Sequence, residues 1–446
     1  MPKRTDAKGA GRLEAPGVMN MRTGVRETLH RAVMGALDED ALIDKVRTML
    51  RTPSLSGEEE KVARLFTEGM TSLGMRAELQ PVPASSKMAA SYNAIGRLAG
   101  SGGGRALLFS GHIDHNPIVS GWTHDPYGAQ IIDGWIYGFV HMKAAGACYL
   151  AALDAVQKAG VELKGDIVLA YVCGELRGGI GTQHALANGL TANWFVLGEP
   201  TELQLATCHC ASQVVRVHVL GRAKHFATED VPGLRAVNAV EVAARVISAL
   251  GGSHRPLKSR EDGGFLTFTP QAGFEGLPQL NVGAIRGGLS RAYNETRPAL
   301  FPDVCTITID VRLIPGMSRE SVHRDLTDFM DGFRAQDEAD VRWQIEFADD
   351  TFPIPFSSPS DSPVVEAIVA AHERVHGVPP QWSKVLRFAA SDASWMQAAG
   401  IPGVIYGPTG RYLSRPDERC EIADLVKAAR TYAGVMVDIC GADSKP

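Results

Sequence analysis

The sequence lacks long apolar runs, because charged residues or glycine interrupt its hydrophobic segments, whereas a membrane-spanning helix needs roughly 20 apolar residues. We therefore do not expect an integral membrane protein. An excess of positive charge is also missing: 45 Lys and Arg residues stand against 50 Asp and Glu residues, which gives a net charge of -5. Binding to nucleic acid depends on clustered cations that neutralise phosphates, so nucleic acid is not an expected partner.

Cysteine is sparse as well. The chain has seven cysteines among 446 residues, and an odd, scattered set does not resemble the framework of a disulfide-rich secreted protein. The tightest pair lies in Cys208-His209-Cys210, but a zinc site needs about four ligands and no matching second cluster exists. Residues 1–30 lack the apolar core of a secretory signal and are predicted to form a flexible extension. Together these features indicate a cytoplasmic protein with reduced thiols.

The positive signal is an alternation of short buried-type strands with amphipathic helices. Strands are predicted at residues 105–110, 166–172, 193–197 and 403–406, and a helix at 144–159. Two helices between residues 38 and 75 precede them, and Ser56 is predicted to cap the second. This order favours an α/β domain whose mixed, mostly parallel sheet has helices on both faces. Functional residues are then expected at the strand ends.

The middle of the chain has a different character. Alternating strands are predicted at residues 213–220, 265–269, 280–285, 305–312 and 341–347, with helices at 238–250 and 319–334. The helical segment 362–376 then resumes the first pattern. We therefore predict a discontinuous catalytic domain, residues 31–212 and 350–446, interrupted by an inserted α+β domain, residues 213–349.

Histidine and acidic residues follow several of the predicted strands. His112 and Asp114 stand two residues apart at a strand end, where both side chains can project to one side. A ligating histidine often has its second ring nitrogen held by a carboxylate, so Asp114 could orient His112. Taken alone, such a pair is more often a solvated loop feature, and the argument depends on its companions. These are His141 before Met142-Lys143, Glu175 in Cys173-Gly174-Glu175 and Glu199 in Gly198-Glu199-Pro200.

The order and spacing of these motifs resemble metallopeptidase family twenty, the group of aminoacylase, acetylornithine deacetylase, succinyl-diaminopimelate desuccinylase and glutamate carboxypeptidase. The resemblance implies a metal-dependent hydrolase of carbon–nitrogen bonds, with an inserted ferredoxin-like domain that acts as lid and dimer interface. By position it implies that His112 and Glu199 bind the first metal and that Asp114 orients His112. It also implies that Glu175 is the general base.

Three positions depart from the family pattern. The family's metal-bridging Asp is His141 here, the second of its paired glutamates is Leu176, and its C-terminal histidine is Ser414. A neutral imidazole cannot bridge two cations as a carboxylate does, and leucine offers no lone pair. The sequence therefore predicts one weakly held divalent ion, Mn, Zn, Co or Fe, bound by His112, His141 and Glu199. The alternative is a relative whose site has decayed.

Without a second cation, protein cations or the substrate itself must take over part of substrate binding. A single arginine is more often a surface charge, but several arginines near a cleft would favour a small anionic substrate. The candidate substrate-binding residues are Arg177, Arg387, Tyr412, Ser414 and, by resemblance to lid positions, Asn294 and Arg312. The segment Gly221-Arg222-Ala223-Lys224-His225 resembles one whose His reaches the partner subunit's active site and stabilises the oxyanion. His225 therefore implies a homodimer or higher homo-oligomer.

The expected reaction is hydrolysis of a carbon–nitrogen bond by a metal-activated water, with Glu175 as general base. An outlying activity of this superfamily, conversion of 5-nitroanthranilate to 5-nitrosalicylate and ammonia, would suit a single ion, because an ortho amino-carboxylate could approach one cation and an arginine together. We expect such an aromatic amine as substrate. The alternatives are an N-acyl amino acid amidohydrolase or dipeptidase, and a binding or scaffold protein without turnover.

Overall fold

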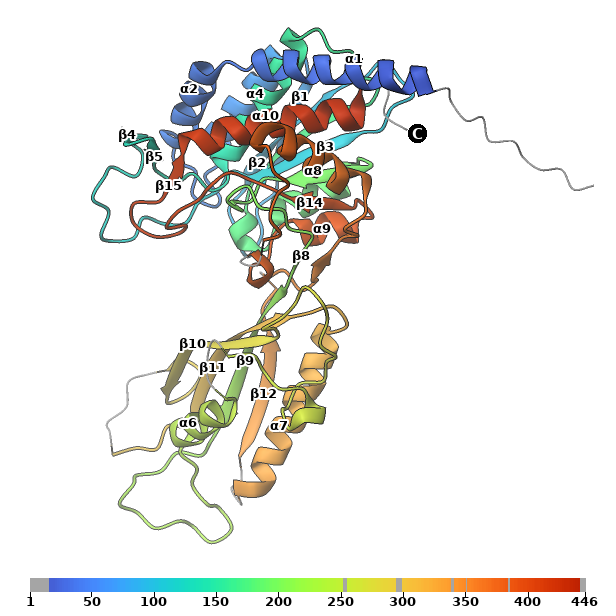
Figure 1. The fold of residues 1–446 in the computed structure, drawn as a ribbon. Coiled ribbons are helices and arrows are strands. Elements are labelled where there is room, and N and C mark those ends of the chain that lie inside the picture. The colour runs from blue at the N-terminus through green and yellow to red at the C-terminus, as the bar shows by residue number, and fades with distance from the viewer. Residues whose placement is uncertain are drawn as a thin grey trace, which may run out of the picture.

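The computed structural model describes residues 16–251, 255–293, 299–337, 341–349, 351–383 and 386–441. They form two lobes joined by a narrow waist (Figure 1). The larger lobe contains both chain ends of the described region, and the smaller lobe is built from the middle of the chain. Among the described residues, no helix combines the length and apolarity needed to cross a membrane.

A six-stranded sheet forms the centre of the larger lobe, in the order β1–β2–β6–β3–β7–β14. Its strands are β1 Arg76–Val82, β2 Ser91–Leu98, β3 Leu107–His112, β6 Ile167–Val172, β7 Trp194–Leu197 and β14 Gly403–Ile405. The last four pair in parallel, and β1 and β2 add an antiparallel edge. The predicted mixed, mostly parallel sheet is confirmed. Strands β1 and β2 escape the sequence analysis, since the edge strand β1 is largely exposed and contains Pro81.

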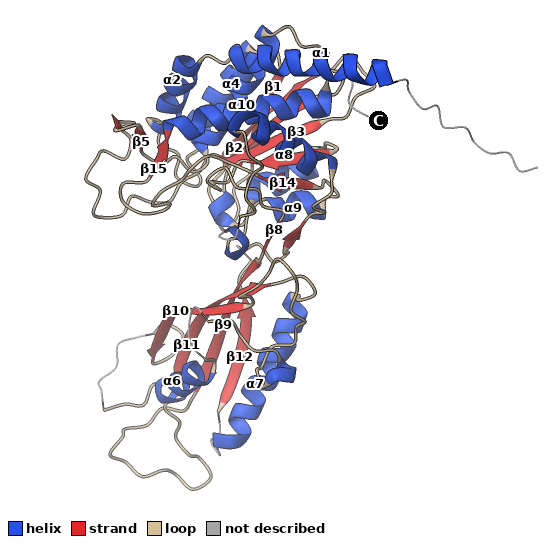
Figure 2. Cartoon of the chain, viewed as in Figure 1, coloured by secondary structure: helices blue, strands red, loops and turns tan. Residues whose placement is uncertain are grey.

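Helices cover both faces of this sheet, as predicted (Figure 2). The side chains of β3 alternate, so that Leu107 and Phe109 belong to one core and Leu108 to the other. The first core also takes residues from α2 (Glu39–Leu50), α3 (Glu60–Ser72), α4 (Lys143–Lys158), α8 (Pro363–His376) and α10 (Ile422–Cys440). The second includes residues of α9 (Ala393–Ala398), with α5 (Ile180–Ala187) packed beside it. The sheet is therefore buried on both sides.

The N-terminal segment differs from its prediction. Helix α1 spans Pro16–Gly35 and lies along α10 (Figure 1). His30 Nε2 lies 2.9 Å from the carboxylate of Asp438, and Arg374 Nη1 lies 2.7 Å from the same group. The prediction of a flexible extension is therefore wrong for residues 16–30, while residues 1–15 lie outside the described residues. The sequence hides this contact because His30 and Asp438 are 408 positions apart.

The smaller lobe is a four-stranded antiparallel sheet in the order β12–β9–β11–β10, with α6 and α7 sharing its core. Its elements are β9 Ala211–Leu220, α6 Ala239–Ala249, β10 Gln279–Gly288, β11 Val304–Leu313, α7 Arg319–Asp337 and β12 Arg342–Phe347. This βαββαβ order is ferredoxin-like. The predicted strand 265–269 is not formed, because Leu266 makes only an isolated bridge with Ser259.

Short elements complete the chain near the sheet edge and the waist. Strands β4 Ile131–Ile132, β5 Trp135–Tyr137 and β15 Arg419–Glu421 form a small sheet, and β8 Cys208–His209 pairs with β13 Phe356–Ser357 at the waist. The single turns are η1 Glu175–Arg177, η2 Arg260–Asp262 and η3 Leu386–Phe388. Pairing of β15 with β5 brings the segment before β15 close to the loop that follows β3.

The buried carboxylate of Asp438 should contribute to stability in a pH-dependent way. Burial alone raises its pKa, but the hydrogen bonds and charges of His30 and Arg374 outweigh burial and lower it. The contribution is therefore present above the unfolded-state pKa of about 3.9 and is lost as pH falls through the folded-state pKa. We expect Asp438→Asn to lose about 1.5–3 kcal/mol at pH 7 and less below pH 4, measured by urea unfolding. A loss of unfolding free energy in Asp438→Asn that is the same at pH 7 and below pH 4 would contradict this account.

Candidate metal centre

Three potential metal ligands converge at the carboxyl edge of the central sheet. His112 ends β3, Glu199 follows β7, and His141 lies just before α4. Because β3 and β7 are parallel neighbours, the residues that follow them meet at the same edge. The ligand atoms of all three residues lie within 4.8 Å of one another. Among the residues that the structure describes, no other group of three His, Cys, Asp or Glu side chains was found to converge in this way.

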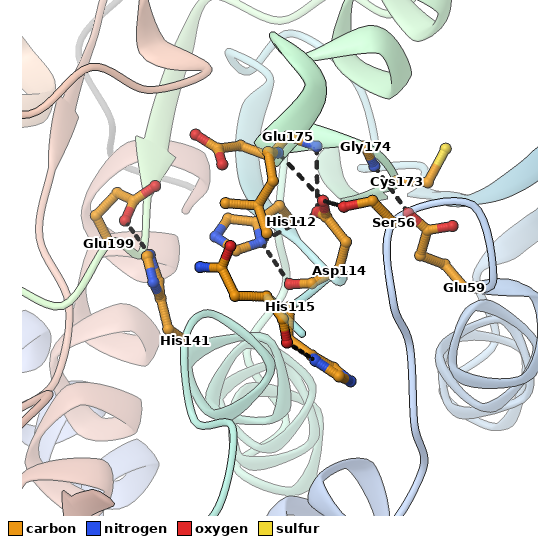
Figure 3. A network of polar contacts seen from close by, with 12 residues as sticks. Ser56, Glu59, His112, Asp114, His115, His141, Cys173, Gly174, Glu175 and Glu199 are labelled. Carbon is orange, nitrogen blue, oxygen red and sulfur yellow. Dashed lines mark hydrogen bonds and ion pairs between the residues drawn. The ribbon is translucent and has the colours of Figure 1, made fainter. Parts of the chain in front are cut away.

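The donor atoms of this group fit a divalent cation. The imidazole of His141 donates to Glu199 Oε2 at 2.6 Å, and the His141 and His112 rings meet edge to face, with centroids 4.6 Å apart. His112 Nε2 is buried without a hydrogen-bond partner in the described part of the chain, although an unsatisfied buried group costs about 1–3 kcal/mol. Figure 3 shows this ring beside His141 and Glu199. Two imidazoles and one carboxylate suit Mn, Fe, Co or Zn.

Negative charge accumulates around His112, which also favours a cation. Burial lowers the pKa of His112, but the nearby carboxylates of Asp114, Glu175 and Glu199 outweigh it and raise this pKa to about 10. The ordinary value for histidine is about 6.5. The pocket therefore stabilises positive charge at the position where the resemblance expects a metal.

Asp114 fixes the orientation of His112. Nδ1 of His112 lies 3.0 Å from the backbone oxygen of Asp114 and 3.3 Å from its Oδ1. The carboxylate also accepts the Ser56 hydroxyl at 2.7 Å and the backbone amides of Glu175 and Leu176, each at 3.1 Å. Burial raises the pKa of Asp114, but these partners, His112 first, hold it below its usual value. The backbone oxygen and the ionised side chain of Asp114 keep a proton on Nδ1, so that Nε2 is the nitrogen at which a metal would replace the second proton.

Glu175 lies in the turn η1, directly after β6 and its short connection. Gly174 and Gly178 flank the turn with φ values of 63° and 88°, a left-handed conformation that glycine adopts without steric cost. Burial and the charge of Glu199 raise the pKa of Glu175 well above its usual value, although His112 opposes them. A buried carboxyl group with a raised pKa beside a metal centre suits proton transfer.

The positions of the missing second-metal ligands line a small hollow beside His141. Ser414 Oγ accepts the Asn116 amide at 2.8 Å, while Leu176 contributes apolar atoms. Glu418 also lines the hollow, but one of its oxygens accepts the His141 amide and the other the Ser414 amide, each at 3.0 Å. The described residues therefore provide no second set of converging ligands here.

Two predicted substrate-binding arginines lie at the waist. Arg387 pairs with Glu275 of the smaller lobe and lies over the ring of Phe388. Arg312 lies 2.7 Å from Asp310 and donates to the backbone oxygen of Phe388 at 3.3 Å. Both guanidinium groups thus have partners within the chain, and their contact with a substrate stays a prediction.

The other candidates are spread more widely. Arg177 is exposed two residues after Glu175. Tyr412 is 52% exposed and packs under the guanidinium of Arg419. Asn294 lies outside the described residues. Of the predicted substrate-binding residues, Ser414 is the one that lines the hollow beside His112 and His141.

His225 lies in the smaller lobe, in the segment between β9 and α6. Figure 1 shows this segment at the end of the lobe that is farthest from the central sheet. Its ring stacks on that of Phe226, with centroids 5.4 Å apart. Within one chain, His225 therefore does not reach the metal centre, and a second copy would have to supply it.

Sequence reasoning overlooked three buried groups near the centre. Burial raises the pKa of Asp392 to about 7, although His112 opposes it. His209 Nε2 lies 2.9 Å from Ser391 Oγ. Glu418 accepts hydrogen bonds from the backbone amides of both His141 and Ser414. The available signal for Asp392 was its place in Ser391-Asp392-Ala393, which resembles the family's substrate-facing loop.

Comparison with known proteins decides the family. The model of peptidase family M20/M25/M40 matches residues 108–438, well over half of the chain. The chain belongs to this family. The resemblance drawn from the motifs is thereby confirmed, and the chain is a hydrolase of carbon–nitrogen bonds.

Two groups of relatives illustrate the similarity. Acetylornithine deacetylase from Salmonella arizonae is 28% identical over 395 residues, covering 85% of this chain and 92% of the relative. N-formyl-4-amino-5-aminomethyl-2-methylpyrimidine deformylase from Bacillus subtilis is 24% identical over 381 residues, covering 78% and 83%. Among solved structures, aminopeptidase PepT from Bacillus cereus superposes with a TM-score of 0.70 at 19% identity, covering 90% of this chain and 98% of the other. Human carnosine dipeptidase 1 also gives 0.70, at 14% identity, covering 93% and 98%.

Removal of the Asp114 charge should weaken metal binding. Asp114→Asn keeps the size of the side chain but leaves His112 without its anionic partner. We expect the dissociation constant for Mn²⁺ to rise about 10–100-fold, measured by calorimetric titration of chelator-treated protein. Asp125→Asn is a control for the loss of one negative charge, because the exposed Asp125 accepts the Tyr127 amide in the same connection. An unchanged affinity in Asp114→Asn would contradict the orienting role.

Proposed function

We propose that this protein hydrolyses a carbon–nitrogen bond of a small carboxylate-bearing substrate with one divalent ion, held by His112, His141 and Glu199. The observation that carries the proposal is an asymmetry. One ligand set is complete and includes the unpartnered Nε2 of His112, whereas Leu176 and Ser414 stand where a second ion would need ligands. If the whole site had lost its function, we would expect ligands to be missing from both sets.

The residues around this set have separate tasks. A divalent ion bound there would lower the pKa of a water molecule. Glu175 accepts the proton of the attacking water and returns it to the leaving nitrogen, a task for which its raised pKa suits it. Asp114 keeps His112 in the ligating tautomer. His225 of a second copy would donate a hydrogen bond to the developing oxyanion.

The incomplete second site predicts weak metal retention. Each lost ligand removes binding energy, and three protein ligands remain. Purified protein is therefore expected to lose its ion during dialysis against a chelator and to regain activity when Mn²⁺, Zn²⁺, Co²⁺ or Fe²⁺ is added.

Two substrate classes meet these requirements. N-acyl amino acids are favoured by the relatives, which include a deacetylase and a deformylase. An ortho-amino aromatic carboxylate is favoured by the single ion, because its amino and carboxylate groups can approach one cation together. An electron-poor ring can also be attacked by hydroxide directly, so no carbonyl group has to be polarised. Phe139 offers an aromatic wall in the hollow. The comparisons give no support to 5-nitroanthranilate in particular.

A substrate panel with a base-deficient variant tests the proposal. Metal-loaded protein is assayed for product release from N-acetyl and N-formyl amino acids, dipeptides and nitroanthranilates. We expect turnover in at least one class and a loss of about 10²–10⁴-fold in kcat for Glu175→Gln, since the amide cannot accept the proton. Wild-type turnover in Glu175→Gln would refute the assigned base. Metal-dependent ligand binding without turnover of any compound would favour a scaffold protein.

We further propose that the active form is at least a dimer in the cytoplasm. Large apolar side chains of the smaller lobe are exposed in the single chain, namely Phe226 at 63%, Val231 at 61%, Leu234 at 52% and Ile285 at 49%. Strand β10 is an edge strand of that lobe, and edges with exposed apolar residues favour pairing. The seven free cysteines agree with a reducing compartment.

Complementation between inactive variants tests the shared site. Glu175→Gln and His225→Ala are each expected to be nearly inactive, because one lacks the base and the other the oxyanion donor. In a mixed dimer, the His225→Ala subunit has an intact base and receives an intact His225 from its partner. Coexpression should therefore restore about a quarter of wild-type activity for random pairing in a two-fold dimer. Activity no higher than that of the parents would contradict the cross-subunit role.

A further inference from the structure

The connection between α2 and α3 is hydrogen-bonded at several points to residues around the metal centre. We call residues 52–59 the strap. The sequence predicts Ser56 as the cap of α3, but the N-cap residue is Glu59, and Ser56 binds Asp114 instead. The hydrogen bonds that join the strap to the site are Lys143 Nζ to Thr52 O at 3.0 Å, Ser54 N to His115 Nε2 at 3.0 Å and Ser56 Oγ to Asp114 Oδ2 at 2.7 Å.

Glu59 ends the strap and is fully buried. Its Oε1 accepts the backbone amide of Gly174 at 3.0 Å. Its Oε2 accepts the amide of Gly57 at 2.8 Å and the hydroxyl of Ser91. Within the described part of the chain, no Lys or Arg side chain is recorded as pairing with this carboxylate. Burial and the charge of Asp114 raise the pKa of Glu59 to about 7, although its hydrogen bonds lower it. A buried carboxyl group without a cation is costly, and its hydrogen bonds offset part of that cost.

Those hydrogen bonds hold the loop of the general base. The three successive amides of Gly174, Glu175 and Leu176 all donate to buried carboxylates, the first to Glu59 and the other two to Asp114. The amides of Glu175 and Leu176 converge on one carboxylate, as in an anion-binding nest. Glu59 and Asp114 together hold the backbone on both sides of the Glu175 Cα. Figure 3 shows Glu59 and Asp114 on the same side of this loop.

The conformation of Gly174 gives the Glu59 contact a role in fixing the turn. Gly174 has φ of 63°, and a Cβ at this position would lie 2.6 Å from Sδ of Met88. A loop that starts with glycine has many accessible conformations. The hydrogen bond from Gly174 to Glu59 selects one of them, and this conformation sets the direction of the next side chain, Glu175.

We propose that Glu59 is a positioning residue for the reaction: through the Gly174 amide it holds the turn that aims Glu175 at the metal-side water. Glu59 contacts neither substrate nor metal ligands, and it acts through the base. This inference rests on the proposed function of Glu175. It assigns a role in catalysis to the strap, which the ligand set alone does not require.

A double-mutant cycle tests the proposal on the metal-loaded, full-length protein. Glu59→Ala is expected to lower kcat about 10²-fold, because a displacement of the base by about 1 Å has an effect of this size. KM and the dissociation constant for Mn²⁺ should stay within about two-fold of wild type, since the ligands are untouched. In the Glu175→Gln background, Glu59→Ala should cause no further loss of kcat. Losses that multiply would overturn the proposal.

Conservative variants separate positioning from folding. Glu59→Gln keeps an oxygen that can accept the Gly174 amide and should recover much of the kcat lost in Glu59→Ala. Glu59→Asp keeps the charge but is one methylene too short, so its kcat should resemble that of Glu59→Ala. Asp438→Asn, a loss of another buried carboxylate in the same lobe, should lower stability and leave kcat unchanged. Equal kcat values in wild type and Glu59→Asp would overturn the proposal, even if Glu59→Ala fails to fold.

The two hypotheses fail in different ways. If Glu175→Gln retains wild-type kcat, the proposed general base is wrong, whatever Glu59 does. If Glu175→Gln is slow and Glu59→Ala lowers its kcat further, the general base stands and only the positioning role of Glu59 is refuted.

Discussion

The buried carboxylate of Asp114 is the constraint on which the rest of the site depends. Its Oδ1 lies 3.3 Å from His112 Nδ1, which also donates to the Asp114 backbone oxygen at 3.0 Å, so that Nε2 is the nitrogen left for a metal. The two oxygens of this carboxylate also accept hydrogen bonds from the backbone amides of Glu175 and Leu176. A single anion thus links His112 on β3, a proposed metal ligand, to Glu175 after β6, the proposed general base, and the parallel pairing of these strands fixes their separation. Asp114 would therefore help to position both the metal ligand and the group that transfers the proton.

The same constraint supports the proposal that this site holds one ion rather than two. Leu176 follows the base directly, and its amide still donates to Asp114 although its side chain offers no ligand. A side chain without a ligand atom at this position is therefore compatible with an intact loop. The backbone amide of Ser414 likewise donates a hydrogen bond to the carboxylate of Glu418. The framework of the hollow persists while its ligands have changed, which leaves polarisation of the substrate to a second subunit or to the substrate's own groups.

Local pattern predicts much of this arrangement. Strands β3, β6 and β7 are continuous buried runs, and motif spacing identifies His112, Glu175 and Glu199. Contacts between distant segments are what the pattern misses. Helix α1 is stabilised by a partner near the other end of the chain, and the edge strand β1 buries too little to show a clear pattern. The hydrogen bond from Gly174 to Glu59 spans 115 positions. The sequence identifies a buried charged residue only where that residue belongs to a recognised motif.

The central claim is that one divalent ion is held by two imidazoles and one carboxylate. Anomalous diffraction at the Mn absorption edge, on crystals grown with excess Mn²⁺, tests it most directly. The account predicts one peak per chain, about 2.0–2.3 Å from a nitrogen of His112, a nitrogen of His141 and an oxygen of Glu199. Two filled positions about 3.5–4 Å apart, as in two-metal hydrolases, would contradict it, as would a peak that makes no contact with His141.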